Sequence, residues 1–369
     1  MSGEPDMVVP DYGGASLDGV VPAIFKRRER ATAWLPDLVV DADQVVLLVL
    51  DGLGWLQLQD RTDLAPTMAA MTGGPITSVA PSTTATALTS LVTGARPAEH
   101  GVVGYRVRVA GTEVLNVLRW STAGGDARNL VPPAEFQDKE PFGGSKPPVV
   151  TRAELTDSGF TAAHLAGVRH YSWRMPSTLV GRVEALLGDG EPFVYAYYDG
   201  VDKVAHEFGL GRMYDMELTA ADALVARVID VLPPGAALVV TADHGQVDVG
   251  ENVVRIHPEV DRLTASLSGE GRFRWLHARP GRREALLDAA TARHSDNGWV
   301  RSREQAVAER WFGGPLRPEV ESRLGDVALV AHQPVAFVDP ADTGEIRLMS
   351  RHGSLTPAEM LVPLIAARP

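Results

Sequence analysis

Cysteine is absent from this 369-residue chain, so the protein can form neither a disulfide nor a thiolate metal site. Any bound metal ion must therefore be held by Asp, Glu or His. No apolar run is long enough to span a bilayer. The first residues also lack the basic and apolar regions of a secretory signal, so we expect a cytoplasmic protein that does not associate with membranes.

Basic residues are fewer than acidic ones, with 35 Lys and Arg against 47 Asp and Glu and a net charge of -12. This charge disfavours a nucleic-acid polymer as a partner, although a small phosphorylated ligand can still bind at a metal site. A chain of this length is expected to form a large domain with an insertion, or to carry a second small domain. The composition indicates no particular oligomeric state.

Short apolar runs alternate with helical patterns, which predicts an α/β fold with a central, mostly parallel sheet flanked by helices. Three runs are each followed closely by an acidic residue and a glycine: QVVLLVL at 44–50, FVYAYY at 193–198 and ALVVTA at 237–242. Ligands of open α/β sheets bind beyond the carboxyl ends of the strands. We therefore expect these three strand ends to meet at one crevice.

Helical patterns predict helices over 158–167 and 212–233, the second ended by Pro-Pro-Gly at 233–235. The apolar positions expected to face the core in this second helix are Met216, Leu224, Val228 and Val231. The segment 121–148 is rich in Gly and Pro, and we expect a long surface excursion that lies over the site or wanders.

Residues 255–344 differ in character from the rest of the chain. Strands are predicted over 272–280 and 326–339, and helices over 281–294 and 304–312. We interpret this region as a small α+β cap or insertion. Residues 1–254 and 345–369 then form the catalytic core, which includes a strand-like run at 345–350.

Several Asp and His residues occur where metal ligands would be useful. Asp202 and His206 are four residues apart, a spacing that places both on one helix face, although an exposed polar pair has the same spacing. Asp51 and the adjacent Asp243 and His244 follow apolar strands, and His352 follows the strand-like run. These six residues can supply enough oxygen and nitrogen ligands for two divalent ions.

The stretch PSTTATALTSLVTG at 81–94 places hydroxyl groups at the start of a predicted helix that ends at Gly94. Such a hydroxyl commonly serves as a helix N-cap. It can instead be a nucleophile, because a helix N-terminus also attracts a phosphoryl group.

The order of these motifs resembles the alkaline phosphatase superfamily, and most closely its type I phosphodiesterase and nucleotide pyrophosphatase family. The motifs are DG at 51–52, PSTT at 81–84 with TG and HG after it, DxxxH at 202–206, DHG at 243–245 and HG at 352–353. The likeness runs from Val45 to the C-terminal LTPAEMLVPLIA, and it is weak over 106–190 and 255–344. It implies an alkaline-phosphatase-like fold and the hydrolysis of phosphate esters.

The resemblance implies one ion held by Asp51, Asp243 and His244 and a second held by Asp202, His206 and His352. Zinc is the expected metal, with manganese or magnesium as alternatives. The implied nucleophile is Thr84, with Thr83 as its nearest competitor, and the implied intermediate is a phosphothreonine.

Some positions depart from the family pattern. Tyr105 stands where the family commonly has an asparagine that binds a phosphoryl oxygen, and Lys203 follows the ligand Asp202 within the altered PDxxGH motif. Asn116 and Trp120 are further candidates for substrate binding. We expect a small phosphorylated substrate, a phosphodiester or pyrophosphate, with a phosphomonoesterase or a catalytically silent phosphoryl-binding protein as the alternatives.

Overall fold

The computed structural model describes residues 6–29, 32–109, 111, 113–342, 344 and 347–369. The largest sheet in this part of the chain has seven strands, which are, in chain order, β1 (Gln44–Leu50), β2 (Thr72–Thr77), β7 (Pro148–Arg152), β8 (Arg169–Trp173), β9 (Phe193–Tyr198), β10 (Ala236–Thr241) and β19 (Leu361–Ala367). Their spatial order is β2-β19-β10-β1-β9-β7-β8. The five strands from β10 to β8 pair in parallel, while β19 runs antiparallel to its neighbours β10 and β2.

The three strands singled out in the sequence lie side by side in the middle of this sheet. Val49 of β1 is aligned with Tyr197 of β9 on one side and with Thr241 of β10 on the other. Residues 45–50 are fully buried, as expected for a strand with both faces covered. These three strand ends therefore meet at one edge of the sheet, where the sequence predicted a common crevice.

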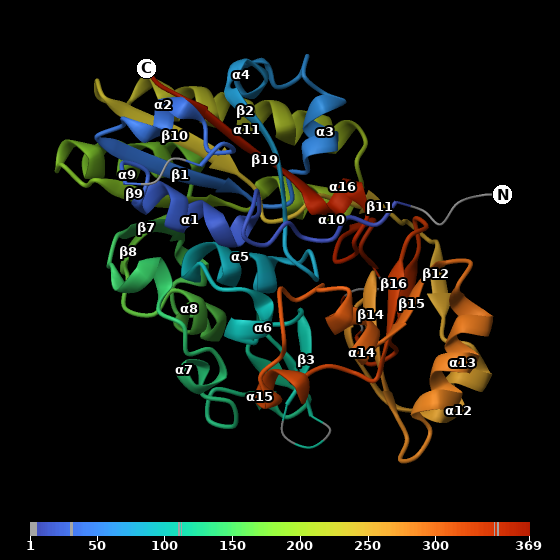
Figure 1. Ribbon diagram of the computed structural model, residues 1–369. Helices are drawn as coiled ribbons and strands as arrows, with labels where there is room; N and C mark the ends of the chain where they lie inside the picture. The colour runs from blue at the N-terminus through green and yellow to red at the C-terminus, as the bar shows by residue number, and fades with distance from the viewer. Residues whose placement is uncertain (1–5, 30–31, 110, 112, 343, 345–346) are drawn as a thin grey trace.

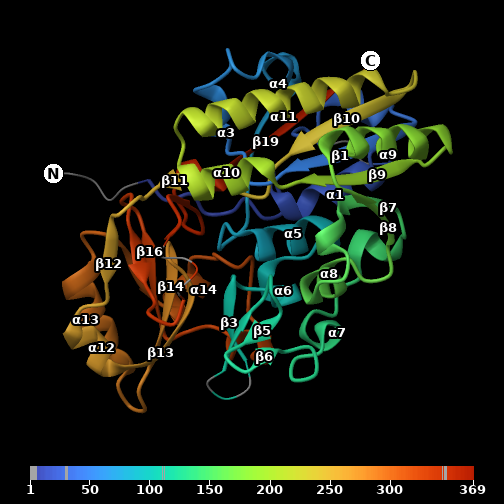
Figure 2. The ribbon, with the colours of Figure 1, turned by 180° about the vertical axis from the view of Figure 1, so that it is seen from behind.

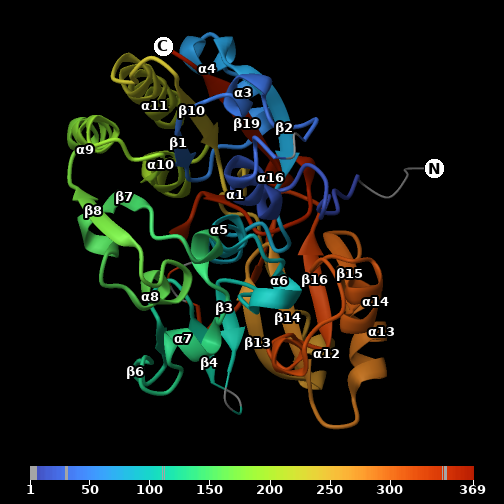
Figure 3. The same cartoon turned by 60° about the vertical axis from the view of Figure 1, so that its left-hand side comes forward.

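Helices cover both faces of the sheet (Figures 1 and 2). One face carries α9 (Pro176–Gly188), α10 (Gly200–Phe208) and α11 (Arg212–Asp230), and the other carries α1 (Leu17–Phe25) and α5 (Thr84–Thr93). Figure 3 shows the sheet between these two groups of helices. The predicted α/β class with a mostly parallel sheet flanked by helices is confirmed.

A second, antiparallel sheet lies beside the first (Figure 1). Its order is β13-β14-β16-β15, and its strands and adjacent helices are α12 (Pro258–Leu263), β13 (Thr264–Glu270), β14 (Phe273–Ala278), α13 (Arg283–His294), β15 (Gly298–Ser302), α14 (Arg303–Ala308) and β16 (Val327–Ala331). Most of the elements predicted in this region are present, but the helix predicted over 304–312 ends at Ala308. Strands β13 and β15 were not predicted, and the limits 255–344 stay a prediction.

The segment 121–148 runs over the surface as expected, and much of it is exposed, but it does not wander, because a few buried side chains anchor it. Phe142 is fully buried against Phe25, Phe193 and Tyr195. Two aromatic side chains, Phe142 and the buried Phe136, fix the segment despite its Gly and Pro content.

The long helix α11 buries only part of the face expected for it, and it ends at Asp230, before the half-buried Val231. Met216 is 57% exposed, whereas Tyr214, Leu218 and Val225 are buried. The predicted positions Leu224 and Val228 do face the core, since they lie next to that stripe on the helix.

No helix in the described ranges is both long and apolar enough to cross a membrane.

Short elements complete the described chain. They are α2 (Asp37–Val40), α3 (Trp55–Gln59), α4 (Pro66–Ala70), α6 (Pro97–His100), β3 (Arg106–Arg108), β4 (Val114–Asn116), β5 (Ser121–Thr122), β6 (Gly125–Asp126), α7 (Pro133–Phe136), α8 (Gly159–His164), β11 (Val247–Asp248), β12 (Val253–Arg255), α15 (Pro318–Glu321), β17 (Ala336–Val338), β18 (Ser350–Arg351) and α16 (Pro357–Met360). The strand-like run predicted at 345–350 falls partly outside the described residues.

Candidate metal centre and active site

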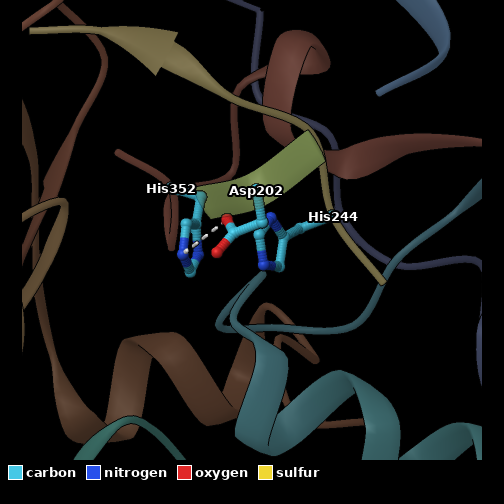
Figure 4. A group of neighbouring side chains, drawn as sticks. All are labelled: Asp202, His244 and His352. Carbon is cyan, nitrogen blue, oxygen red and sulfur yellow. Dashed lines mark ion pairs between the residues drawn. The ribbon is translucent and has the colours of Figure 1, made fainter. Parts of the chain in front are cut away.

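The six candidate metal ligands come together at the carboxyl end of the central strands. Asp51 follows β1, Asp243 and His244 follow β10, Asp202 and His206 lie on α10, and His352 follows β18. Two overlapping groups have ligand atoms within 4.8 Å of one another: Asp51 with Asp243 and His244, and Asp202 with His244 and His352. Figure 4 shows the side chains of the second group facing one another.

The first group consists of two buried carboxylates around one imidazole. His244 Nε2 lies 3.5 Å from Asp51 Oδ1 and 3.4 Å from Asp243 Oδ2. Both of these carboxylate oxygens are buried and have no hydrogen-bond partner among the described residues. Burial raises the pKa of Asp51 well above its usual range, and the nearby charges of Asp243 and Asp202 raise it further. A cation at this point would satisfy both oxygens and offset the repulsion.

The second group contains Asp202, His244 and His352, and His206, which belongs to neither group, lies beside its carboxylate. Asp202 Oδ1 is 3.3 Å from His206 Nε2 and 4.0 Å from His352 Nε2. Asp202 and His206 share one face of α10, as their spacing predicts. The side-chain amide of Gln246 also donates to Asp202 Oδ1 at 2.6 Å, which fixes this carboxylate.

All three histidines present the same ring nitrogen to the centre. The Nδ1 atoms of His206, His244 and His352 lie 2.7, 3.0 and 3.0 Å from the backbone oxygens of Ser350, Gly245 and Ser82. A carbonyl oxygen can only accept, so each Nδ1 carries a hydrogen, and Nε2 is the ring nitrogen left to bind a metal ion. Burial, together with His244 and His206, lowers the pKa of His352 well below its usual range, which keeps this ring neutral. The donor set therefore fits divalent ions.

Thr84 places its hydroxyl group beside this centre. It begins α5, and its Oγ1 lies 3.1 Å from His244 Nε2. Thr83 occupies the N-cap position but makes no side-chain cap hydrogen bond in the described structure. Thr84 lines the cavity beside the metal ligands, whereas Thr83 is 1% exposed and does not line it.

A cavity of about 210 Å³ extends from this centre. Asp51, Thr84 and Asp202 line its metal end, and much of its remaining wall is apolar: Leu88, Leu118, Leu155, Phe160 and Leu165. This arrangement can hold a phosphoryl group at one end and a mostly apolar or aromatic group at the other.

Lys203 also lines this cavity, and Asp199 fixes its position. The ammonium group is 2.5 Å from Asp199 Oδ2, and Asp199 in turn accepts hydrogen bonds from Arg152 at 2.8 to 3.0 Å. Burial alone would raise the pKa of Asp199, but the hydrogen bonds from Arg152 and Lys203 lower it. Asp199 thus stays charged and holds Lys203 at the cavity.

The other candidate substrate residues lie elsewhere. Asn116 Nδ2 donates to the Tyr105 hydroxyl at 2.7 Å, and both residues line a different cavity of about 600 Å³. Trp120 is 1% exposed and donates to Val131 O at 2.7 Å, so the structure does not bring it to either cavity. None of these three lines the cavity at Thr84 in the described part of the chain.

Two residues that support the ligands were not predicted. The Tyr197 hydroxyl donates to Asp51 Oδ2, and Gln246 binds Asp202. Gln246 could have been suspected because it follows the Asp-His-Gly motif directly.

Gly52, which adopts a φ of +75°, lies so close to Asp202 that a Cβ would come within 2.9 Å of Asp202 Cβ. A glycine is therefore required at this turn.

The sequence profile of the family described as type I phosphodiesterase / nucleotide pyrophosphatase matches residues 45–185 and 177–355 of this chain. These ranges include all six candidate metal ligands and Thr84. No curated protein sequence matches the chain.

Among solved structures, the murine ectonucleotide pyrophosphatase / phosphodiesterase 5 is 16% identical, with a TM-score of 0.66 and coverage of 88% of each chain. The human ectonucleotide pyrophosphatase / phosphodiesterase 5 is 18% identical, with a TM-score of 0.67 and the same coverage. Phosphonoacetate hydrolase from Sinorhizobium meliloti 1021, in complex with phosphonoacetate, is 19% identical, with a TM-score of 0.64 and coverage of 89% of this chain and 91% of that chain. At these identities the likeness establishes the fold.

Proposed function

Because the chain belongs to the type I phosphodiesterase / nucleotide pyrophosphatase family, of the alkaline phosphatase superfamily, we propose that it hydrolyses a phosphodiester or pyrophosphate bond with two divalent ions. The substrate in this proposal is a small phosphorylated molecule. The family itself supports a phosphoesterase activity, and the proposal adds the ions, the nucleophile and the type of bond.

The observation that carries this proposal is the hydrogen bond that each of the three histidines makes from Nδ1 to a backbone oxygen. Each ring donates its Nδ1–H in this bond, which leaves Nε2 as the ring nitrogen that can bind a metal ion. The Nε2 of His244 lies beside Asp51 Oδ1 and Asp243 Oδ2, two buried oxygens without a hydrogen-bond partner in the described part of the chain. Asp51, Asp243 and His244 would hold one ion, and Asp202, His206 and His352 the other. A mixed oxygen and nitrogen donor set suits zinc, with manganese or magnesium as alternatives. Bound ions of this kind polarise the phosphoryl group and stabilise both the entering and the leaving oxygen.

Thr84 is the proposed nucleophile. Its Oγ1 bonds to phosphorus while the bond from phosphorus to the leaving oxygen breaks, and the hydroxyl proton passes through solvent to that oxygen, which gives a phosphothreonine and the released leaving group. Water then attacks phosphorus, the bond from phosphorus to Oγ1 breaks, and one proton of the water restores the Thr84 hydroxyl as the phosphoryl product leaves. Two observations support this role: the 3.1 Å contact with His244 Nε2, and the position of Thr84 at the start of α5, where the backbone favours an anion. A murine relative bound to AMP is described as inactive when one of its threonines is replaced by alanine.

The cavity supports a substrate with an apolar or aromatic group beside the phosphorus atom. Its wall is largely apolar beyond Thr84, and Lys203 supplies a positive charge at its edge. A nucleotide derivative meets these requirements, since the base supplies an aromatic face and a second phosphate would meet Lys203.

Hydrolysis of aryl phosphates by the zinc-loaded protein tests the proposal. We expect an aryl phosphodiester to be cleaved with a higher kcat/KM than the matching aryl phosphomonoester. The reverse order would assign the protein as a phosphomonoesterase. Fewer than one bound ion per chain after zinc loading, with neither ester cleaved, would indicate a silent phosphoryl-binding protein.

A further inference from the structure

A fully buried ion pair joins the second sheet to the loops of the metal centre. Arg272, immediately before β14, donates from Nε and Nη2 to the two carboxylate oxygens of Glu359 on α16, each at 2.7 Å. Both side chains are 0% exposed. The same guanidinium donates to the backbone oxygens of Gln333 and Val335 at 2.9 and 2.8 Å. Glu359 is thereby fixed to the turn after β16.

Glu359 in turn holds two of the loops that carry metal ligands. Its carboxylate accepts from the backbone N–H of Ser354 at 2.9 Å, two residues after His352. Its backbone oxygen accepts from the N–H of Gly245 at 2.9 Å, the residue after His244. One glutamate therefore orients the backbone beside a ligand of each proposed ion.

The same contacts continue to the nucleophile. The Ser82 hydroxyl donates to the Ser354 oxygen at 2.6 Å, and Ser82 N donates to the Gly353 oxygen at 3.2 Å. Ser82 O accepts from His352 Nδ1 at 3.0 Å, and Ser82 is two residues before Thr84. A shift of the loop at Ser354 would therefore move both a metal ligand and the segment that presents Thr84.

A buried ion pair is by itself weak support for stability, because desolvation of the two charges offsets their attraction. The Arg272–Glu359 pair instead sets an orientation: its two parallel hydrogen bonds fix the plane of the Glu359 carboxylate, which accepts the hydrogen bond from Ser354 N–H. We propose that Arg272 and Glu359 are positioning residues through which the second sheet sets the place of His352 and Thr84. This inference rests on the proposed metal centre.

Substitution of Arg272 by Met tests the inference, with Arg274→Met as the matched control. Arg274 is also 0% exposed but bonds to the backbone of Gly269 and Phe337, on or beside the second sheet. We expect Arg272→Met to weaken zinc binding at the proposed site that contains His352, because the loop at Ser354 loses its fixed carboxylate partner. The expected loss of affinity is about 10- to 100-fold, the range seen when groups that orient metal ligands are removed. Arg274→Met should keep both zinc affinities, measured by competition with a chelator below the Tm of each variant.

Amide hydrogen exchange gives a second readout that does not depend on bound metal. In the metal-free protein, Arg272→Met should speed exchange at Ser354 and its neighbours, while Arg274→Met should leave them unchanged. Arg272→Lys, which keeps the charge, should recover part of the zinc affinity but not the two-bond geometry. Equal zinc affinity and equal exchange at Ser354 in Arg272→Met and in the wild type would overturn the inference.

A double variant covers the case in which Arg272→Met does not fold. Arg272→Met with Glu359→Met replaces the pair by apolar side chains of similar size, a change that proteins often tolerate. We expect a folded protein in which one zinc site is weakened and the Ser354 amide exchanges faster; retention of both wild-type zinc affinities would overturn the inference. A wild-type protein that binds no zinc would contradict the proposed function, whereas a difference at Ser354 between the metal-free variants would still support the positioning role.

Discussion

His244 and His352 stack face to face, with ring centroids 3.5 Å apart and planes 12° apart. Each ring is held by an Nδ1 hydrogen bond to the backbone, so both Nε2 atoms are directed by the fold without a metal ion. His244 also contributes to both groups of ligand atoms, which places the two proposed ions next to each other. The fold thus brings candidate metal ligands more than 100 positions apart in the sequence, such as His244 and His352, into contact.

Removal of a ligand from one site should lower the metal content without abolishing it. His352→Ala is expected to reduce bound zinc from two ions to one per chain, because Asp51, Asp243 and His244 remain. Elemental analysis after zinc loading and gel filtration measures this change. His332→Ala, a histidine that binds Ser295 O away from the centre, serves as the control and should retain two ions.

Thr84→Ala should abolish most of the hydrolysis. We expect a fall in kcat of at least roughly 1,000-fold, the scale seen when a nucleophile is removed, with zinc content unchanged. Thr83→Ala is the matched control, since Thr83 is adjacent but does not line the cavity. If Thr83→Ala lost activity and Thr84→Ala retained it, the nucleophile would be reassigned to Thr83.

Lys203→Met should affect substrates that carry a second phosphate. The loss of one charged hydrogen bond predicts a rise in KM of about tenfold for a nucleoside diphosphate or pyrophosphate substrate. A simple aryl phosphodiester should show little change. Lys146→Met, at an exposed surface position, controls for the loss of one positive charge. Equal effects on both substrates would argue against a contact between Lys203 and the second phosphate.

The buried His277 should make stability depend on pH. Burial, with a contribution from the charge of Arg108, lowers its pKa to about 4. The pKa of a histidine in an unfolded chain is about 6.5, so the unfolded chain takes up the proton first as the pH falls. The contribution of the neutral, buried His277 to the free energy of unfolding is therefore complete above this pH, and it is lost as the pH falls toward 4. Between about pH 7 and pH 5 the wild type should lose about 1 to 2 kcal/mol more than His277→Gln, measured by urea unfolding.

Phe142→Ala should test how firmly the segment 121–148 is packed. Phe142 is fully buried, and truncation of a buried Phe typically costs about 3 to 5 kcal/mol. Leu130→Ala, in the same segment but 52% exposed, should change the free energy of unfolding by less than about 0.5 kcal/mol. A similar small change for Phe142→Ala would mean that the segment is not held by its aromatic side chains.

The sequence alone determined the parts of this protein that depend on local pattern. The run QVVLLVL reads as a buried strand because both faces are apolar, and Asp51 then falls at its carboxyl end. Asp202 and His206 share a helix face because their spacing matches the helical repeat. The order of these motifs was specific enough to indicate the family.

Only the tertiary structure decided which distant groups meet. Trp120 and Tyr105 were reasonable candidates from their sequence positions, yet neither lines the cavity at Thr84. The Tyr197 and Gln246 contacts and the Arg272–Glu359 pair could not be predicted either, because local periodicity contains no information about which side chains pack across elements. Sheet order and the placement of the second sheet set these contacts, and they depend on the summed packing of the whole chain.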